Sequence, residues 1–201
     1  MMRDDLATLI GSRICHDLIS PIGAIGNGVE LLEMTGSGAA SPEMELISGS
    51  VQDASARIRF FRIAFGSAKG HSHVARREIR SILRAVGTGS RMAIDWQIEG
   101  DAPRDRVQVA FLVLQCFESA MPMGGEVSVT EAGPVWRMSA TGKRLSPDAA
   151  LWNGLADPDS LPQVTAARVQ FALLPQVLAT SGLALSTDLT AERLTVEISP
   201  A

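Results

Sequence analysis

The sequence lacks the features of membrane-embedded and secreted proteins. No run of apolar residues reaches the roughly 18 that a membrane-spanning helix needs, and the first residues, Met-Met-Arg-Asp-Asp, do not have the pattern of a secretion signal. The two cysteines, Cys15 and Cys116, have neither metal-binding nor disulfide spacing, so we expect reduced thiols. These absences predict a cytoplasmic protein with no membrane partner.

A large positive charge is also absent. The chain has 18 Lys and Arg against 22 Asp and Glu, a formal net charge of -4, which gives no general attraction for nucleic-acid phosphates. His71 and His73 are too few to make a metal site on their own, and we interpret their segment as a linker. We expect no nucleic-acid partner and no metal bound by the chain. Its 201 residues, 46% of them apolar, are enough for one sizeable core or two small ones.

Apolar residues at intervals of three and four predict a helical hairpin in the first part of the chain. The first helix is expected over residues 4–34, and Ser41 followed by Pro42 predicts the start of the second. Each helix carries an apolar stripe, so we expect a second copy of the chain to pair with it in a four-helix bundle. The alternative is that the second domain covers the stripe. The apolar stripes consist of Ile14, Leu18, Ile22, Ile25, Val29 and Leu32 in the first helix, and of Leu46, Ile47, Val51, Ala54, Ile58 and Phe61 in the second.

A cluster of glycine and serine at Gly66, Ser67, Gly70 and Ser72 predicts a boundary between domains 1–70 and 71–201. The second domain is predicted to combine helices with antiparallel strands. This combination indicates an α+β sandwich with one helical layer. The expected elements are helices over 76–86, 104–121 and 165–180, and strands over 91–98, 126–130, 135–140, 183–188 and 194–198.

The residues with chemical potential lie in the run CHDLISPI, residues 15–22, in the first expected helix. At about 100° per residue, His16 points roughly 160° away from the centre of the apolar stripe, toward solvent. Its neighbours on that face, Ser12, Ser20 and Gly23, are small, so a large partner can approach the ring. A neutral imidazole is a nucleophile that forms covalent intermediates near neutral pH. His16 is therefore the candidate nucleophile, and the alternative is a solvated surface histidine.

The same run resembles the H-box of sensor histidine kinases, a histidine followed by an acid and then by Ser/Thr-Pro-aliphatic. Residues 12–31, SRICHDLISPIGAIGNGVEL, are similar to the ChpT family of histidine phosphotransferases, and the order of elements fits that family over nearly the whole chain. The resemblance implies a hairpin that dimerises into a four-helix bundle, followed by a domain like a degenerate histidine-kinase ATPase. It also implies that His16 accepts the phosphoryl group.

Three departures from a working kinase argue against the use of ATP. The segment 104–121 has no asparagine to hold magnesium and ATP, and residues 139–144, SATGKR, lack the aspartate of an Asp-x-Gly-x-Gly box. Residues 157–163, DPDSLPQ, offer no glycine-rich lid. By this comparison we expect no cofactor to be bound by the chain.

By resemblance, His16 relays a phosphoryl group between receiver-domain aspartates of a hybrid histidine kinase and of response regulators, with Mg²⁺ supplied by the receiver domains. Asp17 can orient the imidazole, accept its proton or stabilise the imidazolium, and an ordinary solvated carboxylate is the alternative. We hypothesise that Ser20 and Pro21 shape the helix beside the docking surface and that Arg13 helps to balance the phosphoryl charge. Two other functions stay open: a non-enzymatic dimeric docking module for two-component proteins, and a divergent histidine kinase that uses ATP.

Overall fold

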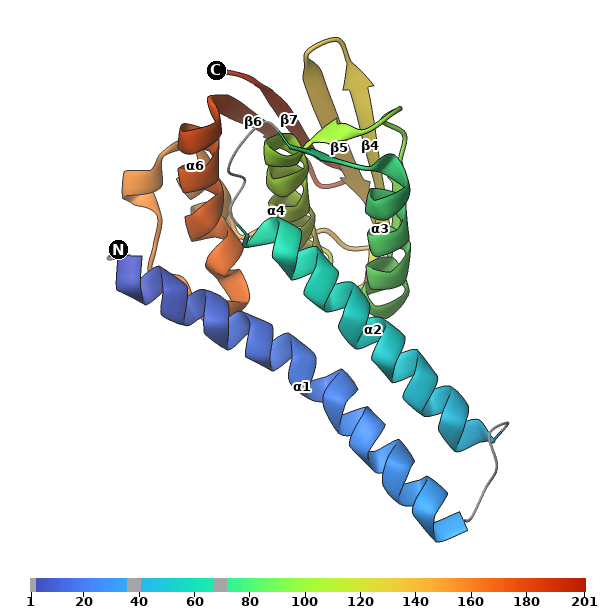
Figure 1. The fold of residues 1–201 in the computed structure, drawn as a ribbon. Coiled ribbons are helices and arrows are strands. Elements are labelled where there is room, and N and C mark those ends of the chain that lie inside the picture. Colours follow the sequence, from blue (N-terminus) through green and yellow to red (C-terminus); the bar gives the residue numbers. More distant parts are fainter. Residues whose placement is uncertain (1–2, 36–40, 67–71) are drawn as a thin grey trace.

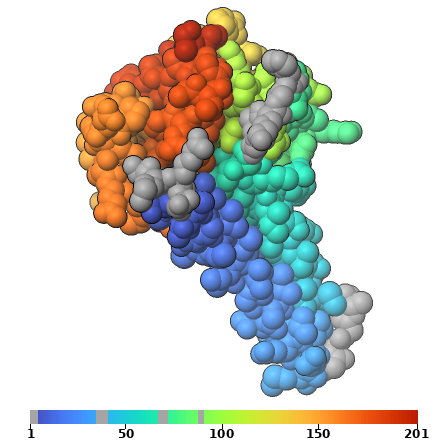
Figure 2. Space-filling view, turned by 60° about the vertical axis from the view of Figure 1, so that its left-hand side comes forward, coloured from blue at the N-terminus to red at the C-terminus, as the bar shows by residue number. Residues whose placement is uncertain are grey.

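The computed structural model describes residues 3–35, 41–66 and 72–201. Two long helices form an antiparallel hairpin, and the rest of the chain forms an α/β part at one end of it (Figure 1). The space-filling view shows the far half of the hairpin projecting as an arm (Figure 2). Helices and strands combine as the sequence predicts, in an α+β fold. None of the helices in the described ranges is long and apolar enough to cross a membrane.

The hairpin consists of α1 (Arg3–Thr35) and α2 (Pro42–Ala64), close to the predicted bounds. The predicted start of α2 is confirmed, because the Ser41 side chain accepts a hydrogen bond from the Met44 amide at 3.4 Å and Pro42 occupies the first turn. Pro21 lies inside α1. Because proline has no amide hydrogen, the carbonyl of Asp17, four residues earlier, receives no helical hydrogen bond from it.

The main sheet has five strands in the order β2-β4-β5-β7-β6. Its strands are β2 (Met92–Trp96), β4 (Gly125–Ala132), β5 (Val135–Thr141), β6 (Leu183–Leu189) and β7 (Leu194–Pro200). The prediction of antiparallel strands throughout was wrong for β2, which pairs with β4 in parallel. A helix separates these two strands along the chain, and a crossover of this kind permits parallel pairing. A second, two-stranded sheet joins β1 (His73–Val74) to β3 (Ala102–Pro103).

One layer of helices covers the sheet, as predicted (Figure 1). The layer contains α3 (Arg76–Ser90), α4 (Arg104–Ala120) and α6 (Val169–Ser181), the last preceded by the short helix η2 (Ala166–Arg168). A further helix, α5 (Ala149–Ala156), was not predicted. It is only eight residues long and is capped at its start by Asp148, whose carboxylate accepts hydrogen bonds from the amides of Ala150 and Leu151. So short a helix has too few turns to show a clear apolar period.

The hydrophobic core extends from the α/β part into the hairpin. Phe60 of α2 stacks on Phe111 of α4 with ring centroids 4.7 Å apart, and Leu6 of α1 is buried in the same cluster. The inner half of the hairpin is thus covered by the α/β part, which was the alternative to pairing with a second copy. The predicted boundary falls in residues 67–71, outside the described ranges, so the division into 1–70 and 71–201 stays a prediction.

Candidate functional site

His16 lies on the outer surface of α1, with a side chain that is 85% exposed. Ser12, Ser20 and Gly23, predicted to surround it, are also exposed. An added Cβ at Gly23 would meet nothing within 4 Å. The ring therefore stands on a surface where a large partner has room to approach, as the sequence predicts. Ile19, three residues further along α1, is 69% exposed and adds an apolar side chain to this surface.

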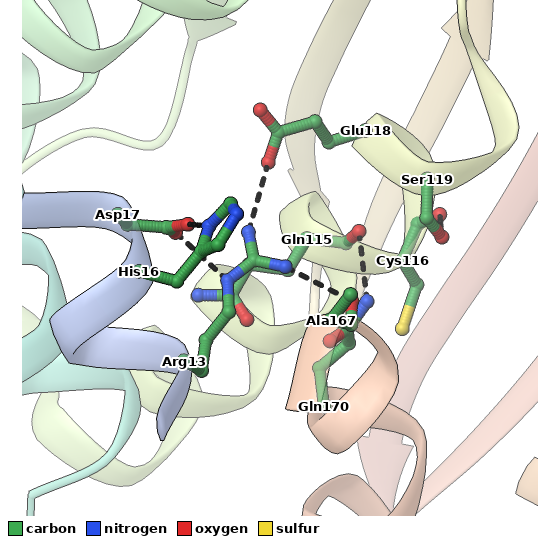
Figure 3. A network of polar contacts seen from close by, with 9 residues as sticks. All are labelled: Arg13, His16, Asp17, Gln115, Cys116, Glu118, Ser119, Ala167 and Gln170. Carbon is green, nitrogen blue, oxygen red and sulfur yellow. Dashed lines mark hydrogen bonds and ion pairs between the residues drawn. The ribbon is translucent and has the colours of Figure 1, made fainter. Parts of the chain in front are cut away.

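Asp17 holds one nitrogen of this ring. Its Oδ1 lies 3.1 Å from Nδ1 of His16, and its Oδ2 accepts a hydrogen bond from Nε of Arg13 at 2.7 Å (Figure 3). Unlike the histidine, Asp17 is only 10% exposed and Arg13 only 16%. The spacing of four residues brings Arg13 and Asp17 together on one face of the helix. Three of the predicted site residues are thus joined in one chain of contacts.

Arg13 also ties α1 to the α/β part. One terminal nitrogen donates to the carbonyl oxygen of Ala167 in η2 at 2.9 Å, and the other lies 3.9 Å from Oε2 of Glu118 in α4 (Figure 3). Burial raises the pKa of Glu118, and the positive charges of Arg13 and Arg57 oppose that shift. Sequence reasoning missed Ala167 and Glu118. A backbone carbonyl 154 residues away carries no sequence signal that could have identified it.

The hydrogen bond to Asp17 decides which nitrogen of His16 is reactive. A carboxylate only accepts hydrogen bonds, so Nδ1 carries the proton that is donated to it. The neutral ring then has its lone pair on Nε2, the nitrogen not bound to Asp17. When Nε2 forms a covalent bond, the ring becomes a cation, and the Asp17 carboxylate is placed to stabilise it. The pair can therefore perform nucleophilic chemistry at Nε2.

Ser20 and Pro21 lie about one helical turn after His16 in α1. Ser20 is exposed on the side of His16, and Pro21 is half-buried. Because Pro21 has no amide hydrogen, the carbonyl of Asp17, the residue that holds the imidazole, lacks its helical hydrogen bond. The proposed roles of Ser20 and Pro21 in docking stay predictions.

The glycines after His16 differ in their surroundings. A Cβ at Gly28 would lie 2.6 Å from Cγ1 of Ile47, so this glycine lets α1 approach α2 closely. A Cβ at Gly23 or Gly26 would meet nothing within 4 Å. Of these three glycines, only Gly28 is therefore explained by packing between the described residues of the chain.

The helix that would hold a nucleotide in a kinase is an interior element here. All residues of α4 from Val107 to Phe117 are buried, and Phe117 stacks on Trp152 of α5, which in turn meets the edge of Phe171 of α6. Burial also raises the pKa of the Cys116 thiol, which keeps it protonated. Aromatic side chains thus fill the space between α4, α5 and α6.

Metal-ligating side chains do not gather anywhere in the described ranges. No group of three or more His, Cys, Asp or Glu residues there could hold a metal ion. His73 is exposed on β1, whereas His71, its predicted neighbour, lies outside the described residues.

Comparisons with known proteins agree with the predicted resemblance. A family model described as the histidine phosphotransferase C-terminal domain matches residues 76–193. The protein phosphotransferase ChpT of Brucella abortus (strain 2308) is 38% identical over 133 residues, 64% of this chain and 62% of the Brucella protein. The match thus spans less than two thirds of that relative. A solved structure of a bacterial phosphotransferase, 29% identical, superposes with a TM-score of 0.79 over 99% of this chain and 98% of that one. Because the matched domain covers more than half of the sequence, the chain belongs to the histidine phosphotransferase family.

Proposed function

We propose that this protein is a histidine phosphotransferase that relays a phosphoryl group between receiver-domain aspartates of a hybrid histidine kinase and of response regulators, through phosphohistidine at His16. The observation that carries the proposal is the exposed imidazole whose Nδ1 is bound to the nearly buried Asp17. This arrangement leaves a nucleophilic nitrogen on an open helix surface. The name of the Brucella relative supports the same activity.

In the proposed step, Nε2 of His16 attacks the phosphorus of a phospho-aspartate. The N–P bond forms, the P–O bond of the acyl phosphate breaks, and the aspartate leaves as a carboxylate with the bonding electron pair. Nδ1 keeps its proton and its hydrogen bond to Asp17 throughout, so the phosphorylated ring is a cation beside an anion. A second receiver aspartate then attacks the same phosphorus and restores the neutral ring. The receiver domains supply Mg²⁺, and this chain supplies the nucleophile and its position.

In this proposal Arg13 acts on Asp17 and does not contact the phosphoryl group directly. Its guanidinium binds Asp17 and the carbonyl of Ala167, and it is largely buried between α1 and the α/β part. We assign it as a positioning residue, which keeps the Asp17 carboxylate directed at Nδ1. A direct role in balancing phosphoryl charge stays a separate prediction.

The proposal includes no ATP and no bound cofactor. A nucleotide would need a polar face on α4 and space beside it. The buried residues of α4 and the aromatic cluster of Phe117, Trp152 and Phe171 oppose such a site. The phosphoryl group therefore comes from another protein, and we place the reaction in the cytoplasm, where receiver domains of this kind work.

We further propose that two copies pair through the outer half of the hairpin. Ile22 and Val29 of α1 are 58% and 43% exposed, and Val51 and Ile58 of α2 are 45% and 54% exposed. Both pairs are seven residues apart, the spacing of the apolar seam in helix bundles. A four-helix bundle would bury all four side chains. The measurement is sedimentation of wild type, Ile22→Glu and Met123→Glu. Met123 is 61% exposed but lies in the α/β part, so only Ile22→Glu should yield monomers.

The decisive experiment mixes the protein with a receiver domain carrying labelled phosphate and with Mg²⁺. Label should reach wild type and His73→Ala, whose replaced histidine is also exposed, but not His16→Ala. Label on His16→Ala would refute the assignment of the acceptor. No label on any variant, across several receivers that still bind the protein, would favour the non-enzymatic docking module. Labelling of wild type by ATP alone would favour the divergent kinase.

A further inference from the structure

A groove along the outer edge of the sheet is not used by the proposed phosphotransfer. Its volume is about 520 Å³. One wall belongs to α3, with Arg80, Leu83, Arg84 and Gly87, and the other is formed by all five residues of β2. Because β2 is the edge strand of the five-stranded sheet, this groove follows a strand that has a neighbour on one side only.

The backbone of β2 offers hydrogen-bonding groups to this groove. The amide of Gly125 donates to the carbonyl of Arg91 at 3.2 Å, and the amide of Gln97 donates to the carbonyl of Val129 at 2.9 Å. Backbone groups alternate in direction along a strand, so odd-numbered residues between them face β4. Met92, Ile94 and Trp96 therefore direct their N–H and C=O groups to the outer edge. An edge of this kind is a template for an added strand.

The ends of the groove are not equivalent. At one end α3 comes close to β2, since a Cβ at Gly87 would lie 2.6 Å from the carbonyl oxygen of Met92. Toward the other end, the lining includes Ile94 and Trp96. The indole nitrogen of Trp96 is buried and has no hydrogen-bond partner in the part of the chain that the structure describes. A polar donor of this kind costs free energy until it finds an acceptor.

The groove is positively charged although the whole chain is not. Arg80, Arg84 and Arg91 line it, against Asp95 as the one acid among its lining residues. More broadly, residues 57–91 contain half of the arginines in the chain and a single acid, Glu78, whereas the net charge of the protein is -4. Such a concentrated charge attracts an acidic partner.

The spacing of two arginines matches an extended peptide. Arg80 and Arg84 are four residues apart on α3, which is about 6 Å along the helix axis. Side chains on one face of an extended strand repeat every second residue, at about 6.6 Å. Carboxylates at alternate positions of a strand lying on β2 would each meet one arginine.

We propose that this groove binds an extended acidic segment of a partner protein, which adds to the outer edge of β2 as a sixth strand. The backbone groups of Ile94 and Trp96 hold the added strand, and Arg80 and Arg84 select its acidic side chains. Met92 and Ile94 also line a small cavity together with Arg13 and Asp17. The bound segment would thus tether a partner beside the His16 site, but its binding does not depend on phosphotransfer.

The test uses the full chain and a synthetic peptide, acetyl-Val-Glu-Val-Asp-Val-Glu-Val-amide, with the Gln/Asn version of the peptide as its neutral match. Binding is followed by fluorescence anisotropy and by amide hydrogen exchange. The acidic peptide should slow exchange at Ile94 and Trp96, while Ala93 and Asp95, which already face β4, should not change. Arg80→Gln/Arg84→Gln should weaken binding roughly tenfold at low salt. Lys143→Gln/Arg144→Gln removes the same charge at another exposed site and should bind like wild type.

Three results would overturn the proposal. One is equal binding of acidic and neutral peptides, and another is binding without protection of Ile94 and Trp96, which would show contact through charge alone. The third is no binding of the acidic peptide while vesicles containing phosphatidylglycerol do bind, which would assign the arginines to an anionic membrane surface. Exchange protection is measured on wild type, so the result does not depend on how well any variant folds.

Discussion

Replacement of Asp17 by asparagine tests whether the contact with His16 matters for phosphotransfer. The carboxylate lies 3.1 Å from Nδ1, and Asp17 is only 10% exposed, but the His16 side chain is 85% exposed, so solvent screens the interaction from the side of the ring. A hydrogen bond to a charged group contributes about 1.5–3 kcal/mol, and the exposed ring places this contact at the lower end, so its loss in the transition state slows transfer by roughly tenfold. The asparagine keeps the shape of the side chain but not the charge that stabilises the phosphorylated ring. We therefore expect a slower but still measurable transfer in Asp17→Asn.

The assay is single-turnover transfer from a phosphorylated receiver in excess, sampled by rapid quenching. Arg13→Gln is the companion variant, because it removes the 2.7 Å contact with Asp17 and leaves the aspartate itself in place. We expect a smaller loss of rate for Arg13→Gln than for Asp17→Asn. A wild-type rate in Asp17→Asn would refute the role given to the carboxylate. A larger loss in Arg13→Gln would instead favour direct contact between Arg13 and the phosphoryl group.

Two further predictions concern stability. The raised pKa of Glu118 means that the folded wild-type protein binds this proton more tightly than the unfolded chain does, so wild type loses stability as the pH rises above 4.5. Glu118→Gln has no such proton, and its free energy of unfolding should therefore rise relative to that of wild type over this range. Urea unfolding between pH 4 and pH 8 measures the difference, and a pH-independent difference would contradict the expectation. Gly26→Ala should stabilise α1 by about 1 kcal/mol through helix propensity. In Gly28→Ala, the same gain in helix propensity is opposed by a clash with Ile47 that lowers the free energy of unfolding by about 1–3 kcal/mol. Equal stability of the two variants would show that Gly28 is not needed for the approach of the helices.

Local signals in the sequence were enough to predict most elements of the fold. The apolar period located α1 and α2, and Ser41 with Pro42 located the start of α2 to the residue. The exposure of His16 followed from its angle to the apolar stripe. Each of these features depends on residues close together in the chain, where geometry is fixed by the helix itself.

Features that depend on distant residues could not be predicted. The parallel pairing of β2 with β4 depends on how α4, which lies between them in the sequence, packs on the sheet. No period in the sequence of β2 distinguishes it from an antiparallel strand. The contact of Arg13 with the carbonyl of Ala167 joins residues 154 positions apart through a backbone group that every residue has. Arg13 was therefore assigned to the phosphoryl group, although its spacing of four residues from Asp17 could have indicated the contact between these two side chains.

The contact of Arg13 with Ala167 gives the α/β part a structural role at the exposed histidine of α1. An isolated helix surface presents its histidine in many ring orientations, and a weak acid one residue away does not by itself hold the ring. Here Ala167 and Glu118 fix Arg13, Arg13 fixes Asp17, and Asp17 fixes Nδ1 of the histidine. The α/β part thus sets the orientation of an imidazole that lies outside it, through a carbonyl of η2 and a carboxylate of α4.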